Sequence, residues 1–349
     1  ALAWSEYVDN IDKKSPREVA ESIVELVKNY KFAPFAAVFL AKKGVDPDYA
    51  NNYLEKAQKR TPYQLPIAQL IIHDVPIEFY LKHRSHDPSL SIHDHNQIKI
   101  RELLKVQGEK DVEKVMDEMK RMYPHFGFAY PKHFVKSYQM IKNMEKDPDF
   151  KLDNVVLYLL PNYKPGHDPG TRYDSAFILS AFPIDNLDRL GFNVILASYN
   201  HDFEIEQIAN EVSGNYNCTP GTEWPLTAMA IGGHGFGHKL NISDVPFDIG
   251  FNEKKHSSSI LDINDVGIFG NLIPCFRQNT SVTMILDSCA TASPKALPQS
   301  LFQFSRSELP SNFLVQAPEI DTFIYGAYKK HNLPYFIFDG AKVDKGSKN

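Results

Sequence analysis

The sequence predicts an α/β protein: a three-layer α/β/α domain with a mostly parallel sheet, preceded by an all-α domain. Three observations support this prediction. Apolar residues recur at helical spacing through most of the first 150 residues. After that point short β-rich runs alternate with helical stretches, which is typical of a parallel sheet covered by helices. A length of 349 residues also suits two domains better than one.

The N-terminal part is expected to form a series of helices. Ser15 should cap the first of them, because Pro16 suits the first helical position and Glu18 can close a capping box. Apolar spacing predicts further helices over 46–60, 65–84, 97–107, 111–123 and 130–145. The sequence shows no internal repeat. Its histidines, including His93 and His95, are expected to lie in loops or at helix ends.

The predicted boundary lies in the charged, proline-containing break over 146–149. We therefore expect a helical substrate- or partner-binding domain over 1–148 and the α/β domain over 149–349. The helical domain would recognise a protein partner, cover the site or hold the substrate. Both motifs that carry chemistry lie beyond this boundary.

Six strands are expected in the second part of the chain. Their predicted ranges are Val155–Leu160, Asn193–Ala197, Leu226–Gly232, Ser281–Leu286, Thr322–Tyr325 and Tyr335–Phe338. Helices are predicted between them over 173–190, 202–212 and 265–276. Ligands of such a sheet bind at the carboxyl ends of its strands, so we expect the functional site at these ends.

Composition and charge limit the classes of function. Hydrophobic residues make up 43% and charged residues 23%, which is globular composition. A net charge of −5 gives no reason to expect a nucleic-acid partner. The longest dense apolar stretch, Phe32 to Ala41, is too short for a membrane span, which takes about 20 residues. We expect a protein or peptide substrate and leave the oligomeric state open.

The three cysteines are Cys218, Cys275 and Cys289. They are too few for a disulfide framework, which favours a reducing compartment such as the cytoplasm, with a secreted effector as the alternative. Cys275 lies in an apolar stretch and is expected in the core. Cys218 is interpreted as incidental, which leaves Cys289 as the candidate functional thiol.

Two predicted strands lead directly into reactive side chains. The strand over 226–232 continues into Gly233-His234-Gly235, and the strand over 281–286 continues into Asp287-Ser288-Cys289. Neighbouring strands lie about 4.8 Å apart, so His234 and Cys289 can meet although they are distant in sequence. Such a pair makes a thiolate nucleophile at neutral pH. The Gly235 and Cys289 amides would then form an oxyanion hole.

These motifs resemble those of the caspase, metacaspase, legumain and gingipain group of cysteine peptidases. In that group a hydrophobic strand ending in His-Gly precedes, by about 50 residues, a strand ending in an acidic–small–Cys motif. Asp-Ser-Cys over 287–289 is closest to the metacaspase form, whereas residues 290–292 lack the usual continuation. The resemblance implies a caspase-like fold in a distant member, with cysteine endopeptidase activity on peptide or isopeptide bonds and no cofactor.

Asp287 has two interpretations. It either caps the turn after its strand, or, by resemblance to metacaspases, lines the pocket for a Lys or Arg before the cleaved bond. Ser288 and Gly233 would lie beside the substrate at the same edge. The loop over 162–172 also borders this edge and contains Asp168 and Arg172. An inward-pointing Arg172 would neutralise Asp287 or favour an acidic residue, and both alternatives stay open.

The same residues do not match the patterns of a metal site or a phosphate-binding loop. His234 and His238 have zinc-like spacing, but the glycines between them disfavour a helix, so we expect no metal site. The glycine-rich stretch over 232–237 lacks the Lys-Ser/Thr of a phosphate-binding loop. Two other classes of function remain as alternatives: a non-catalytic interaction module that retains the fold, and a thiol acyltransferase.

Overall fold

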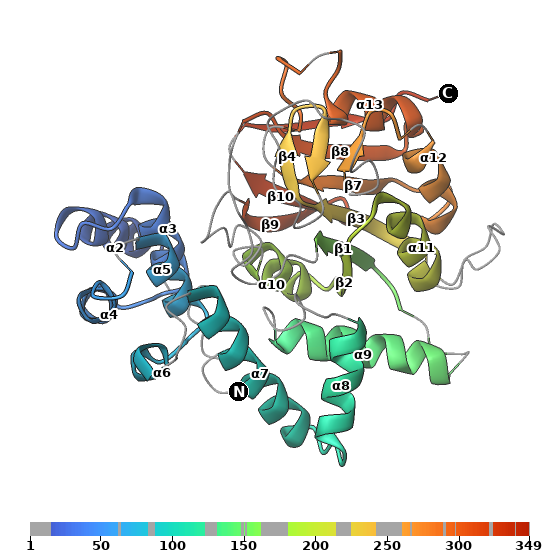
Figure 1. Cartoon of the computed structure of the whole chain (residues 1–349). Helices are drawn as coiled ribbons and strands as arrows, with labels where there is room; N and C mark the ends of the chain where they lie inside the picture. Colours follow the sequence, from blue (N-terminus) through green and yellow to red (C-terminus); the bar gives the residue numbers. More distant parts are fainter. Residues whose placement is uncertain are drawn as a thin grey trace. The chain divides into compact units, whose positions relative to one another are not determined.

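The structure is a computed structural model that describes most of the chain. The described residues are 15–61, 64–82, 88–122, 131–147, 150, 152–161, 181–213, 225–241, 260–265, 267–288, 291–296, 298–320, 324–338 and 340–348. They divide into two compact units (Figure 1). The helical unit takes in the described residues up to Glu113, and the α/β unit begins at Lys114.

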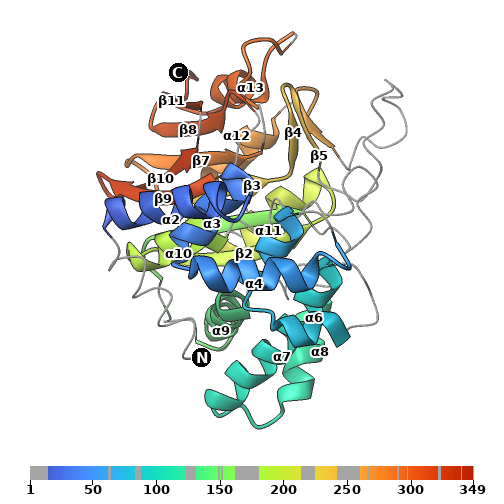
Figure 2. The same cartoon turned by 90° about the vertical axis from the view of Figure 1, so that its left-hand side faces the viewer.

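The regular elements of the helical unit are all helices within the described residues. They are α2 (Pro16–Lys28), α3 (Pro34–Lys42), α4 (Pro47–Ala57), α5 (Gln64–Ile72), α6 (Ile77–Lys82) and α7 (Pro88–Val106). They stack in two rows, α3 to α5 to α7 and α2 to α4 to α6 (Figure 1, Figure 2). The predicted start at Ser15 is confirmed, including the capping box with Glu18. The helix predicted over 65–84 is instead two helices, because Asp74 has a φ of 54°.

Three of these helices end in the same way, which reveals a structural repeat. The left-handed residues that end them are Gly44, Asp74 and Gly108. In each case the next amide donates to a leucine carbonyl five residues back, at 2.9 to 3.0 Å: Leu40, Leu70 and Leu104. The repeat is not evident in the sequence, because Asp replaces Gly in the middle copy and the three leucines are unevenly spaced.

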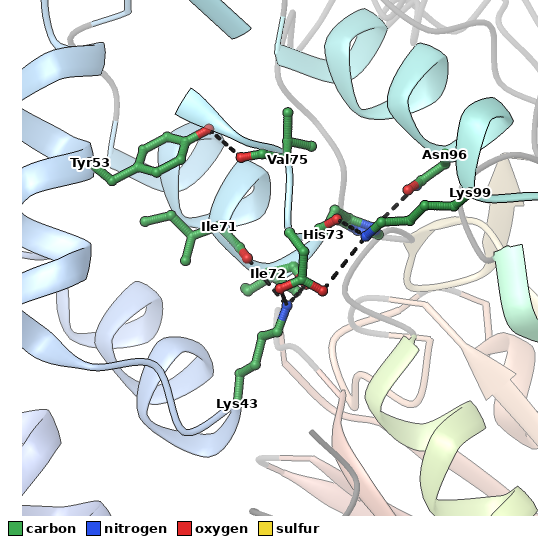
Figure 3. A network of polar contacts seen from close by, with 9 residues as sticks. Lys43, Tyr53, Ile71, Ile72, His73, Val75, Asn96 and Lys99 are labelled. Carbon is green, nitrogen blue, oxygen red and sulfur yellow. Dashed lines mark hydrogen bonds and ion pairs between the residues drawn. The ribbon is translucent and has the colours of Figure 1, made fainter. Parts of the chain in front are cut away.

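Two lysines cap the C-terminus of α5 (Figure 3). Lys43, from the end of α3, donates to the last two carbonyls of α5 and to the carboxylate of Asp74. Lys99, from α7, donates to the carbonyl of His73 at 2.6 Å and pairs with Asp74 at 3.7 Å. The last carbonyls of a helix have no partner within it, so these cations satisfy them and join three helices.

His93 and His95 lie inside α7, half-buried, and not in a loop or at a helix end as predicted. The ring of His95 packs against Phe79, with ring centroids 5.3 Å apart. Burial, together with the nearby Lys99 ammonium, lowers the pKa of His95 to about 4. This imidazole is therefore neutral at pH 7.

The α/β unit is built on a six-stranded sheet. Its strands, in spatial order, are β11 (Ala341–Lys345), β8 (Phe313–Pro318), β7 (Val282–Asp287), β3 (Leu226–Gly232), β1 (Val155–Pro161) and β2 (Asn193–Tyr199). Only the β11–β8 pair is antiparallel. The predicted α/β class with a mostly parallel sheet is confirmed. The chain runs from β1 to β2 on one side and then to β3 on the other, which makes β1/β3 the topological switch point.

Helices and a hairpin cover the two faces of this sheet (Figure 1). One face carries α10 (Ala181–Arg189) and the hairpin of β9 (Ile324–Lys330) and β10 (Leu333–Phe338). The other carries α11 (Asp202–Ser213), α12 (Ile268–Leu272) with the short 3-10 helix η4 (Ile273–Cys275), and α13 (Leu301–Glu308). The central strands β1, β3 and β7 are buried along their whole length.

The last two predicted strands do not join the sheet. They belong to the β9–β10 hairpin, whose turn at His331 and Asn332 has two positive φ angles. The hairpin packs onto the sheet by stacking Phe336 on Tyr158, with ring centroids 5.7 Å apart. The positions in the sheet are taken by β8 and β11, which the sequence pattern did not predict.

A small antiparallel sheet follows the end of β3. It consists of β4 (His234–Phe236), β5 (Lys239–Asn241) and β6 (Ile260–Asp262). A two-residue turn joins β4 and β5, and Gly237 in this turn has a φ of 56°. The sequence pattern did not predict these short strands, which begin at the candidate histidine.

The division between the units differs from the boundary predicted near residue 148. The helix α9 (Pro131–Lys146) packs on β2 of the α/β unit, whereas α8 (Val112–Met122) spans the division. The hydroxyl of Ser137 accepts from the Leu196 amide at 2.8 Å and donates to the Val194 carbonyl at 3.2 Å. Thus α9 completes the hydrogen bonding of the edge strand β2. None of the described helices is long and apolar enough to cross a bilayer.

Candidate active site

The two strands that lead into the candidate motifs are direct neighbours. Strands β3 and β7 run parallel, and Gly232 is the register partner of Asp287 at their carboxyl ends. The amide of Gly233 continues the contact by donating to the Asp287 carbonyl at 3.2 Å. The structure therefore brings the two chain segments together at the carboxyl edge of the sheet, beside the β1/β3 switch point, where ligands of parallel sheets bind.

His234 is the first residue of β4 and lies opposite Asn241, while Gly235 lies opposite Leu240. The side chain of His234 is half-buried. His238 follows Gly237 in the turn, four residues further on. In the described part of the chain, no three His, Cys, Asp or Glu side chains form a group that could hold a metal ion.

Asp287 and Ser288 are both buried, with exposed fractions of 7% and 9%. The phenol of Tyr158 donates a hydrogen bond to Oδ2 of Asp287. The amide of Ser288 donates to the carbonyl of Leu286 at 3.0 Å, so the chain turns tightly at Asp287. The Ser288 hydroxyl lies 3.4 Å from that of Thr291.

Several candidate residues lie outside the described residues. They are Cys289, Asp168, Arg172 and Cys218. Cys275 is fully buried, as predicted, and its thiol donates to the side-chain oxygen of Asn210 at 3.3 Å. Cys275 is therefore a core residue of the α/β unit.

The N-terminus of α13 binds both candidate segments. Its first amide, of Leu301, donates to the Gly237 carbonyl in the β4–β5 turn at 3.0 Å. Its second amide, of Phe302, donates to the Thr291 carbonyl at 3.0 Å. The first amides of a helix lack partners within it, so these two are available for such contacts. Ser300 caps the helix, and a capping box with Gln303 completes its start.

No family model, curated protein or solved structure matches the chain. The function of the site is therefore inferred from the strand register, burial and hydrogen bonding at the carboxyl edge of the sheet.

Two buried tyrosines at this edge were not predicted as site residues. Tyr158 of β1 donates to Asp287, and Tyr199 of β2 donates to the Gly232 carbonyl. Both are fully buried. The hydroxyl of a tyrosine in a buried strand needs a hydrogen-bond partner. A tyrosine within an apolar run of the sequence therefore predicts that a polar group lies nearby.

An acidic group with a raised pKa lies where β6 meets α11. Burial raises the pKa of Asp265 to about 6, and the neighbouring charges of Asp262 and Asp202 add to the shift. The carboxylate of Asp265 accepts a hydrogen bond from the Asp262 amide at 2.6 Å, and this bond lowers the pKa and so partly opposes the upward shift. Asp265 therefore titrates close to neutral pH.

Proposed function

We propose that the α/β unit is a caspase-like cysteine endopeptidase that cleaves peptide or isopeptide bonds of protein substrates. Its nucleophile is Cys289 and its general base and acid is His234. The register of Gly232 with Asp287 is the observation that carries this proposal. His234 follows Gly232 by two residues and Cys289 follows Asp287 by two, so both start from paired positions of neighbouring strands.

The contacts of α13 support this assignment. One helix terminus binds the turn after His234 and also Thr291, two residues after Cys289. Catalysis needs a nucleophile and base held at a constant separation, because small displacements lower the rate strongly. A shared anchor for both segments meets that need.

The reaction follows from these two groups. The imidazole of His234 takes the thiol proton, and the thiolate sulfur attacks the carbonyl carbon to form a C–S bond. The C–N bond then breaks as the imidazolium gives its proton to the leaving amine. His234 then takes a proton from water, whose oxygen attacks the thioester carbon, and the C–S bond breaks to release the acid and the thiolate. The imidazolium returns its proton to the thiolate, which restores the thiol and the neutral imidazole.

Backbone groups supply the remaining stabilisation. The amides of Gly235 and Cys289 donate to the oxyanion that develops on the carbonyl oxygen, each worth roughly 3–4 kcal/mol in comparable sites. Asp287 favours Lys or Arg before the cleaved bond, in line with 15 Lys and Arg against 21 Asp and Glu in residues 151–349. The helical unit binds or selects the protein substrate.

A peptide probe with a thiol-reactive group tests the proposal. We expect it to label the wild-type chain at Cys289, and Cys289→Ala or His234→Ala to abolish both labelling and peptide cleavage. Cys275→Ala is the matched control, because that buried thiol lies in the core and its loss should leave labelling at Cys289 intact. A folded chain without Cys289-dependent labelling would instead be an interaction module, and transfer of the acyl group to an amine would indicate an acyltransferase.

A further inference from the structure

The peptide group that joins Gly232 to Gly233 is held by hydrogen bonds at both of its polar atoms. Its N–H, from Gly233, donates to the Asp287 carbonyl of β7 at 3.2 Å. Its carbonyl oxygen, from Gly232, accepts from the phenol of Tyr199 at the carboxyl end of β2. Because His234 follows directly after Gly233, the orientation of this peptide group sets the direction in which the chain reaches His234.

The phenol of Tyr199 supplies a bond that the neighbouring strand cannot supply. Backbone groups of successive residues point to alternate sides of a strand, and the next amide points to β7, so the Gly232 carbonyl points towards β1. Leu159 of β1 is in register with Ile231, and two residues further on Pro161 stands where the ladder would donate to this carbonyl. Proline has no N–H. Tyr199 is the register partner of Pro161 on β2, and its phenol crosses β1 to replace the missing donor.

Both partners of this hydrogen bond are shielded from water. Tyr199 is fully buried, and β3 is buried along its whole length, Gly232 included. Loss of the donor would leave a buried carbonyl without its partner, which is costly. Two consecutive glycines also have wide conformational freedom, so the peptide group between them depends on its hydrogen bonds for a fixed orientation.

From this geometry we infer that Tyr199 is a positioning residue of the proposed active site. Its phenol fixes the peptide group over 232–233 in the orientation from which the imidazole of His234 meets the thiol of Cys289. The inference rests on the proposed peptidase function and adds a residue that acts through the backbone without touching the substrate. This role needs no access from solvent, in keeping with the burial of Tyr199.

The test compares the wild-type chain with Tyr199→Phe, which removes the hydroxyl and keeps the ring. We expect kcat for peptide cleavage to fall by about tenfold to a hundredfold with KM changed less than about twofold, because the base is displaced while the substrate contacts remain. Alkylation of Cys289 by iodoacetamide, followed across pH by mass spectrometry, should change as well. Its midpoint should rise towards about 8.5, the value of an unassisted thiol, because the thiolate loses a well-placed imidazolium.

Ser137→Ala is the matched control for a loss of stability. It removes hydrogen bonds from Val194 and Leu196, earlier in β2, and leaves the carboxyl end of the strand intact. It should therefore leave kcat and the alkylation midpoint unchanged. Pro161→Ala, introduced into the Tyr199→Phe chain, is a rescue variant. Its new backbone N–H can take the place of the phenol, so it should recover most of the lost kcat.

Each outcome decides the inference. If kcat and the alkylation profile of folded Tyr199→Phe match those of Ser137→Ala, the inference is overturned and the peptidase stands. Absence of Cys289-dependent cleavage in the wild type overturns both. If Tyr199→Phe does not fold, the double variant with Pro161→Ala decides. Cleavage by the double variant supports the role of the hydrogen bond to Gly232, and a folded double variant without cleavage refutes it.

Discussion

The amide of Leu301 donates to the carbonyl of Gly237 at 3.0 Å, which links the first turn of α13 to the hairpin that begins at His234. The next amide in the helix, of Phe302, donates to Thr291 at 3.0 Å. Two segments separated by more than fifty residues thus depend on one helix terminus for their positions. The integrity of this terminus should therefore affect activity as well as stability.

Ser300→Ala should lower the unfolding free energy by about 1 kcal/mol, because it removes the cap of α13. It should also lower peptide cleavage several-fold, since the amides that bind Gly237 and Thr291 begin to fray. Ser15→Ala is the control: it removes the same kind of capping box from α2, in the helical unit. Denaturant unfolding and cleavage rates measure both. Equal losses of cleavage in the two variants would contradict a specific role for α13.

Ser137→Ala should destabilise the α/β unit by about 2 kcal/mol, because the buried Leu196 amide and Val194 carbonyl both lose their partner. Ser198→Ala, on the same strand, is the matched control. The hydroxyl of Ser198 is buried without a hydrogen-bond partner among the described residues, so its removal should be neutral or slightly stabilising. Urea denaturation compares the two variants, and equal effects would argue against edge capping by α9.

A truncated chain that starts at Lys114 should stay soluble and keep Cys289-selective labelling. One that starts at Asp147 should aggregate, because it lacks α9 and leaves the edge of β2 unpaired. Size-exclusion chromatography distinguishes the two. A monomeric, labelling-competent chain from Asp147 onward would show that α9 is dispensable and would support a boundary near residue 148.

Lys43→Met should loosen the helical unit, with a cost of about 2–4 kcal/mol, because it removes the buried cation from the last two carbonyls of α5 and leaves Asp74, among the described residues, with Lys99 alone. Hydrogen–deuterium exchange of the full chain should show faster exchange in α3 and α5. Lys105→Met provides the control, since Lys105 is exposed near the end of α7. Unchanged protection in α5 of the Lys43 variant would mean that the cap is not needed.

Asp265→Asn should stabilise the chain at neutral pH but not in acid. The folded pKa of Asp265, about 6, lies above the ordinary value of 3.8, so ionisation costs the wild type stability as pH rises through this window. The variant should gain about 1 kcal/mol above pH 6, reduced by solvent screening of a half-buried group, and nothing below pH 4. Thermal unfolding of both chains across pH 4 to 8 measures the sign of this stability difference. A gain that is constant with pH would rule out Asp265 as its source.

The capping box at Ser15 and the buried strands β1, β3 and β7 could be predicted from sequence alone. These features depend on residues within one turn of helix or on a continuous apolar run, so the local pattern is sufficient. The same holds for the two motifs at the strand ends. A strand direction and a parallel sheet were enough to expect that His234 and Asp287 lie at one edge.

The tertiary structure was needed to determine which segments form strands of the sheet and which polar groups contact one another in the site. The turn at His331 and Asn332, with two positive φ angles, and the stacking of Phe336 on Tyr158 make β9 and β10 a separate hairpin that packs on the sheet and does not join it. The bond from Tyr158 to Asp287 spans 129 residues of sequence. Such contacts depend on which strands become neighbours and on the small residues between them, and these are set by packing of the whole unit and not by local spacing.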